Sequence, residues 1–124
     1  MSPLAWTAFV VAGAAGAAAR HLLGQAMTER SAGRFPWGTL VVNVTGSFLF
    51  GVVTGLALDH GLAREPRIVV GTGFCGAYTT FSTFTYETIR LVEDGAVKDA
   101  LRNAATTVVA AAVATAAGLG LAAL

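Results

Sequence analysis

Most charged residues of this 124-residue chain fall into three clusters, which leaves four long stretches almost without charge. The clusters consist of Glu29, Arg30 and Arg34, of Asp59, Arg64, Glu65 and Arg67, and of Arg90, Glu93, Asp94, Lys98, Asp99 and Arg102. The stretches between them cover residues 3–27, 37–58, 68–89 and 104–124. Each is about as long as the ~20-residue helix that crosses the ~30 Å hydrocarbon core of a bilayer. The pattern predicts an all-α membrane protein with four transmembrane helices.

The composition supports the same fold class. Only 12% of the residues are charged and 55% are hydrophobic, whereas an average soluble domain has about 25% charged residues. A soluble domain of this size exposes a large part of its chain to water, and too few polar side chains are present to cover that surface. A net charge of +1 predicts no nucleic-acid surface. No repeat or long linker interrupts the chain, so we expect one transmembrane domain over residues 1–124.

Lysine and arginine are nearly balanced between the two ends of the predicted bundle. Four spans place the first and third connections on one side of the membrane, with the termini and the second connection on the other. With Arg20, Arg90 and Arg102 set aside because they lie at helix ends, Arg30, Arg34 and Lys98 lie opposite Arg64 and Arg67. Membrane orientation follows an excess of Lys and Arg, and this chain barely has one. We therefore hypothesise insertion in both orientations, which allows an antiparallel dimer.

The third stretch differs from the other three in its glycines. Gly71, Gly73 and Gly76 lie close together and precede a run of hydroxyl and aromatic residues over 79–86. Glycine destabilises a helix by about 1 kcal/mol relative to alanine, which predicts an interruption between Thr72 and Thr80. Broken backbone is tolerated in a membrane only where it is buried in protein or lines a polar cavity. The third helix is therefore predicted to be broken near its middle, at a functional site.

The same glycines match the dinucleotide-binding pattern G-x-G-x-x-G over residues 71–76. That fold needs several parallel strands and amphipathic helices, whereas the remaining segments are uniformly apolar. No zinc-ligand spacing, nucleophile elbow or phosphate loop is present either. The sequence therefore predicts a protein that is not an enzyme.

Polar and aromatic side chains recur at helical spacing in the second and third stretches. Thr39, Asn43 and Ser47 share one helix face, where they either bond neighbouring helices or line a pathway in which the Asn43 amide donates to an anion. Phe81 and Phe84 also share a face, which indicates either packing or positive ring edges turned toward a small anion. Spacing leaves both alternatives open.

Other isolated polar residues have simple interpretations from position alone. Arg20 lies near the far end of the first helix, where it anchors the helix or raises the anion concentration at a vestibule. Glu87 lies within a turn of Arg90, and an ion pair with it is the simpler expectation, the alternative being a functional acid within the membrane. Asn103 and Thr107 share a face of the fourth helix that is either a pore or a packing seam.

Two motifs resemble the Fluc (CrcB) family of fluoride channels. They are residues 38–46, GTLVVNVTG, and residues 73–84, GFCGAYTTFSTF, and residues 13–20 also resemble the first helix of that family. The resemblance implies an antiparallel, dual-topology homodimer in the lipid bilayer, with two fluoride pores along its interface.

The resemblance also assigns residue roles. It implies a fluoride pore lined by Asn43, Phe81, Phe84, Ser82, Thr83 and Thr107. Arg20 matches an arginine at the vestibule. The backbone carbonyls of Gly76 and Thr79 in both subunits would hold a structural sodium ion at the dimer centre. Asn103 falls where the family often has an aromatic hydroxyl.

The sequence thus predicts a fluoride-selective channel that passively exports fluoride from the cytoplasm and relieves its toxicity, as a multi-pass protein of the cell inner (plasma) membrane. The alternative is a small four-helix, proton-coupled multidrug exporter. Such exporters use a carboxylate deep in the first helix, and none precedes Glu29. A membrane scaffold whose polar residues only join helices is a third possibility.

Overall fold

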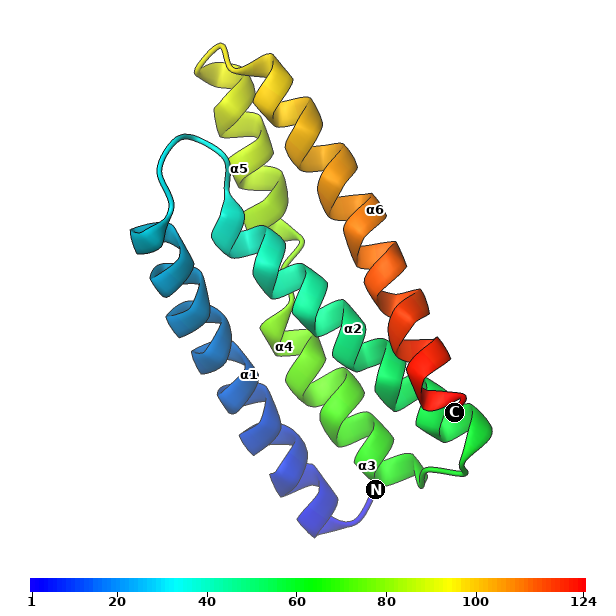
Figure 1. The fold of residues 1–124 in the computed structure, drawn as a ribbon. Helices are drawn as coiled ribbons and strands as arrows, with labels where there is room; N and C mark the ends of the chain where they lie inside the picture. The colour runs from blue at the N-terminus through cyan, green and yellow to red at the C-terminus, as the bar shows by residue number, and fades with distance from the viewer.

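Four helical segments run alongside one another in the computed structural model, which describes residues 1–124 (Figure 1). The elements are α1 (Pro3–Arg30), α2 (Trp37–Asp59), α3 (Arg64–Arg67), the π-helix η1 (Ile68–Cys75), α4 (Gly76–Tyr78), α5 (Ser82–Glu93) and α6 (Val97–Ala122). Both termini and the α2–α3 connection lie at one end of the molecule, and the other two interhelical connections lie at the opposite end (Figure 1). This is the arrangement that four successive crossings produce.

Three of the helices, α1, α2 and α6, are each long and apolar enough to cross a membrane. The third segment consists of α3, η1 and α4 in succession, then non-helical backbone, then α5. The all-helical prediction is confirmed, and the third segment is broken as expected. The helices extend past the apolar stretches, because charged residues at a helix end keep helical backbone while their side chains reach polar surroundings.

The break lies at the end of the predicted interval from Thr72 to Thr80 and extends to Phe81. The glycine-rich residues 71–76 are helical, and the helix ends only at Tyr78. Thr79 is extended, with φ −77° and ψ 157°, and α5 begins at Ser82. The glycines are instead used for packing: a Cβ on Gly73 would lie 3.2 Å from the Phe9 ring and from the Phe9 carbonyl of α1. Contact with α1 therefore outweighs the weak helix propensity of glycine.

Glycines also set the contact between α2 and α6. A Cβ on Gly51 would collide with the carbonyl of Thr115, and one on Gly118 would collide with the carbonyl of Phe48. Gly55 is similarly buried against Ala122. Small residues at such positions let helix backbones approach closely, which is how helices associate in lipid. Gly51 and Gly55 thus allow close packing of α2 against α6.

The outer surface of the chain is apolar. Only 21 of 124 residues are buried, and large hydrophobic side chains cover much of the outside. The exposed ones include Leu4, Val10, Leu22, Val108, Val113 and Leu121. A soluble monomer rarely exposes such continuous apolar surface. The chain is a multi-pass membrane protein.

Candidate functional site

The side chain of Asn43 in α2 forms two hydrogen bonds, both with the backbone of Thr80 at the break in the third segment. Its Oδ1 accepts the backbone N–H of Thr80 at 2.8 Å, and its Nδ2 donates to the carbonyl of Thr80 at 3.0 Å. The side chain is only 8% exposed. A buried amide that pairs with both backbone groups of one residue takes the place of the helical hydrogen bonds there. Asn43 thereby holds Thr80 out of the helix, and one of its two N–H groups remains for another acceptor.

The break deprives two backbone carbonyls of their helical donors. Thr80 N–H, which a continuous helix would direct to Gly76, bonds Asn43 instead. Thr83 N–H, which would bond Thr79, goes to the Thr80 hydroxyl at 3.2 Å. The Thr79 carbonyl has only a long contact of 3.5 Å from Arg20 Nη1. Gly76 and Thr79, the residues expected to hold sodium, thus present the carbonyl oxygens that hard cations prefer.

Both carbonyl-bearing residues border a small cavity. Its volume is about 210 Å³, and hydroxyl residues line it as well. The lining consists of Gly46, Ser47, Phe50, Gly71, Cys75, Gly76, Thr79 and Thr115. Oxygen donors with a cavity beside them fit a sodium ion, and these residues are the ones that would supply its ligands.

Phe81 and Phe84 lie at the start of α5, directly after the break. Their ring centroids are 6.0 Å apart, with an interplanar angle of 48°. Phe81 is 77% exposed on the single chain, whereas Phe84 is half-buried. The backbone N–H of Phe81 has no hydrogen-bond acceptor within the chain. Two ring edges and a free N–H at the positive end of a helix are groups that favour an anion.

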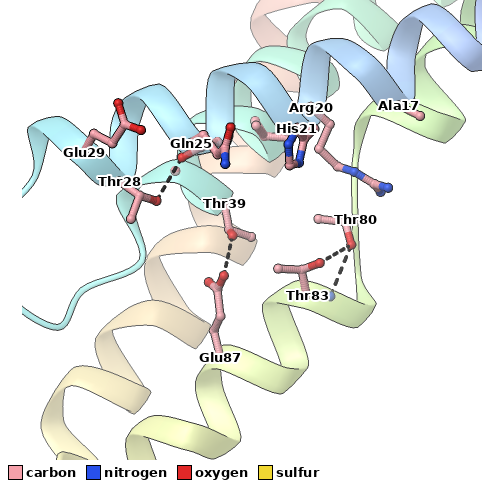
Figure 2. A pocket seen from close by; sticks show the side chains of 13 residues that line it. Ala17, Arg20, His21, Gln25, Thr28, Glu29, Thr39, Thr80, Thr83 and Glu87 are labelled. Atoms are coloured by element: carbon pink, nitrogen blue, oxygen red, sulfur yellow. Dashed lines mark hydrogen bonds between the residues drawn. The ribbon is translucent and has the colours of Figure 1, made fainter.

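Hydroxyl groups surround this helix start. Thr80 Oγ1 donates to Thr83 Oγ1 at 3.1 Å and lies 3.4 Å from Ser82 Oγ. All three residues have accessible surface. Figure 2 shows Thr80 and Thr83 facing the cavity, with the Arg20 side chain extending from α1 toward the same segment.

The larger cavity of the molecule connects these groups with α1 and α2. It has a volume of about 480 Å³ and is lined by thirteen residues. Its polar lining includes Arg20, His21, Gln25, Thr28, Glu29, Thr39, Thr80, Thr83 and Glu87 (Figure 2). The structure therefore places Arg20, the predicted vestibule residue, at a cavity that leads to the break.

Glu87 has a different partner from the one predicted. Thr39 Oγ1 donates to Glu87 Oε1 at 2.9 Å, and the carboxyl makes no ion pair with Arg90. The second oxygen, Oε2, is buried without a hydrogen-bond partner. The expectation was wrong because sequence proximity favoured Arg90, whereas α5 turns Glu87 toward α2 and the cavity. The shared face of Thr39 and Asn43 was the signal that α2 meets this segment.

Thr107 of α6 is not brought to either cavity. It is 6% exposed, and its hydroxyl donates to Asn103 Oδ1 at 3.3 Å. Asn103 is 1% exposed and donates to Thr88 of α5 at 2.8 Å. Within one chain, the face that these two residues share is a packing seam between α6 and α5.

Comparison with known proteins identifies relatives over nearly the whole chain. The family model described as CrcB-like protein, Camphor Resistance (CrcB), matches residues 7–119. A protein of Frankia casuarinae named fluoride-specific ion channel FluC 1 is 46% identical, with 94% of this chain and 95% of the relative covered. A protein of the same name from Leifsonia xyli subsp. xyli is 50% identical over 82% of this chain and 74% of the relative. Fluoride-specific ion channel FluC of Geobacter sulfurreducens is 44% identical, with 90% and 91% covered.

Proposed function

The chain belongs to the CrcB-like family, and we propose that it is a fluoride-selective ion channel that passively exports fluoride from the cytoplasm and so relieves fluoride toxicity. The observation that supports the proposal is the break after Tyr78. Asn43 bonds Thr80 there, Phe81 and Phe84 follow it, and Thr80 and Thr83 line the cavity that Arg20 borders. A channel needs no reaction chemistry, and we assign the protein no enzymatic activity.

The printed names of the relatives support fluoride as the permeating ion, since each is called a fluoride-specific ion channel. None of them is named as an exporter of drugs. The multidrug-exporter alternative is therefore not favoured. The scaffold alternative leaves unexplained why polar groups at the break face a cavity of about 480 Å³ rather than only one another.

Selectivity would arise from replacement of the water around fluoride. Fluoride is small and strongly hydrated, so a pore must offer several donors without binding the ion too tightly. The remaining Asn43 N–H, the hydroxyls of Ser82 and Thr83, and the ring edges of Phe81 and Phe84 supply hydrogen-bond donors and weakly positive groups. No full positive charge lies among them, which favours release as well as entry.

Arg20 would act before fluoride loses its water. Its guanidinium lies at the cavity and reaches the Thr79 carbonyl at 3.5 Å. A fixed positive charge at a cavity mouth raises the local concentration of anions. The Thr107 hydroxyl, which is buried in the single chain, is proposed to join the pore further along α6.

The active form is proposed to be an antiparallel, dual-topology homodimer in the cell inner (plasma) membrane. The support comes from the Phe81 ring, which is 77% exposed on one chain. A second copy would cover this ring and complete two pores. A sodium ion held by the Gly76 and Thr79 carbonyls of both subunits would supply a positive charge that joins the two broken helices at the centre.

The test is fluoride efflux from liposomes that contain the purified protein, followed with a fluoride electrode and repeated with chloride. We expect rapid fluoride efflux and chloride efflux at the level of protein-free liposomes. Absence of fluoride efflux, or equal efflux of both ions, would contradict the proposal. Export in cells is tested separately: deletion of the gene should raise cytoplasmic fluoride and lower the fluoride concentration that stops growth.

A further inference from the structure

The helix α5 is short and is not held in place by the helix before it. It has 12 residues and follows the non-helical residues 79–81. Its rotation about its own axis must therefore be fixed by neighbouring helices. The rotation matters because Phe84 lies in its first turn.

A buried chain of hydrogen bonds connects α6 to the backbone of Phe84. Asn103 Nδ2 donates to Thr88 Oγ1 at 2.8 Å, and Thr88 Oγ1 donates to the carbonyl of Phe84 at 2.8 Å. Thr107 Oγ1 donates to Asn103 Oδ1 at 3.3 Å, which fixes the orientation of the amide. Asn103 is 1% exposed, so water has little access to its amide.

The hydrogen bonds also favour one register of α5. Thr88 lies four residues after Phe84 and therefore on nearly the same helix face. A buried amide left without partners is strongly disfavoured. Any rotation of α5 that carried Phe84 away from its position would also carry Thr88 away from Asn103.

We propose that Asn103 is a positioning residue, which through Thr88 sets the rotation of α5 and so the orientation of the Phe84 ring at the break. The inference rests on the proposed function, in which that ring contributes to selectivity. It accounts for an amide at this buried position, since Asn103 can donate to α5 and accept from Thr107 at once.

The first experiment compares three variants in liposomes. Asn103→Leu and Thr88→Val remove the contact from either side, the second at nearly constant volume, and Thr88→Ser retains it. Thr85→Val is the matched control, because the Thr85 hydroxyl bonds only carbonyls of its own helix, those of Phe81 and Ser82. A buried hydrogen bond shifts the balance between two arrangements about five- to tenfold. We expect the ratio of fluoride to chloride flux to fall by about that factor in the first two variants only.

The second experiment observes the ring directly, independently of conduction. With 4-fluorophenylalanine in place of Phe84, the fluorine resonance should shift or split in Asn103→Leu and Thr88→Val, and should be unchanged in Thr88→Ser and Thr85→Val. If the first two variants unfold at lower temperature but keep both the flux ratio and the resonance, Asn103 is only a stabilising residue and the proposal is overturned. If the unaltered protein conducts no fluoride, the proposed function fails, while the resonances still decide the role of Asn103.

Discussion

Two neighbouring regions of the third segment differ in structure, and in each the structure is the opposite of what local helix propensity predicts. The glycine-rich region Ile68–Cys75 is helical throughout, although Gly71 and Gly73 weaken a helix by about 1 kcal/mol each. The region 79–81 contains no glycine and is the one that breaks. The difference lies in their partners: the first packs against α1, and the second gives its backbone bonds to Asn43. Competition for backbone hydrogen bonds, rather than low propensity, breaks this helix.

The largest effect is expected from the rings that the break presents. Phe81→Ile and Phe84→Ile should each reduce fluoride efflux from liposomes to background, because an aliphatic side chain has no positive edge. The matched control is Phe74→Ile in the glycine-rich region, where the ring stacks on Tyr78 at 5.5 Å. It should lower the unfolding temperature but leave conduction. Full conduction by both of the first two variants would remove the rings from the pore.

A large effect on stability is expected from substitution of Asn43, which takes the backbone hydrogen bonds of Thr80. Asn43→Leu leaves the N–H and carbonyl of Thr80 without partners, which should destabilise the protein by about 2 to 4 kcal/mol. Asn43→Asp keeps an acceptor for the Thr80 N–H, so its stability should lie between those of the unaltered protein and the leucine variant. Thermal unfolding in detergent measures both, with Thr54→Val of α2 as control. A leucine variant as stable as the unaltered protein would show that Asn43 does not maintain the break.

The carbonyls of Gly76 and Thr79, which lack helical donors, predict that the stability of the protein depends on the sodium concentration. If Gly76 and Thr79 hold the ion, stability should rise by about 1.4 kcal/mol for each tenfold increase in sodium above its dissociation constant. Unfolding midpoints in sodium chloride and in N-methylglucamine chloride at equal ionic strength make the comparison. Identical midpoints across the range would argue against a bound sodium ion at the break.

The smallest expected effect is the change in stability when a glycine is replaced by alanine. Whether the variant is stabilised or destabilised distinguishes helix propensity from packing. An alanine in an unobstructed helix should add about 1 kcal/mol of stability relative to glycine, and this is expected for Gly120→Ala, where a Cβ meets nothing within 4 Å. Gly73→Ala places its Cβ against Phe9 and should be neutral or destabilising. Stabilisation by both variants would mean that propensity, not packing, governs the glycine-rich region.

The sequence alone determined the number of helical segments and their approximate extent. Segment length and the placement of charges follow directly from the thickness and polarity of a bilayer, so no knowledge of contacts was required. The motifs also singled out Asn43, which bonds Thr80 at the break, and Phe81 and Phe84, which follow the break in the chain. That the break has a polar partner followed from the rule that broken backbone in a membrane must be buried in protein or line a polar cavity.

Only the tertiary structure decided where within the predicted interval the break lies and what each polar group contacts. Helix propensity is local and small, about 1 kcal/mol per glycine, whereas the bonds from Asn43 to Thr80 join residues 37 positions apart. The same reason explains why Glu87 bonds Thr39 of another helix and not its neighbour Arg90. In a membrane, polar groups take whichever partner the packing brings near, because no water is present to satisfy them.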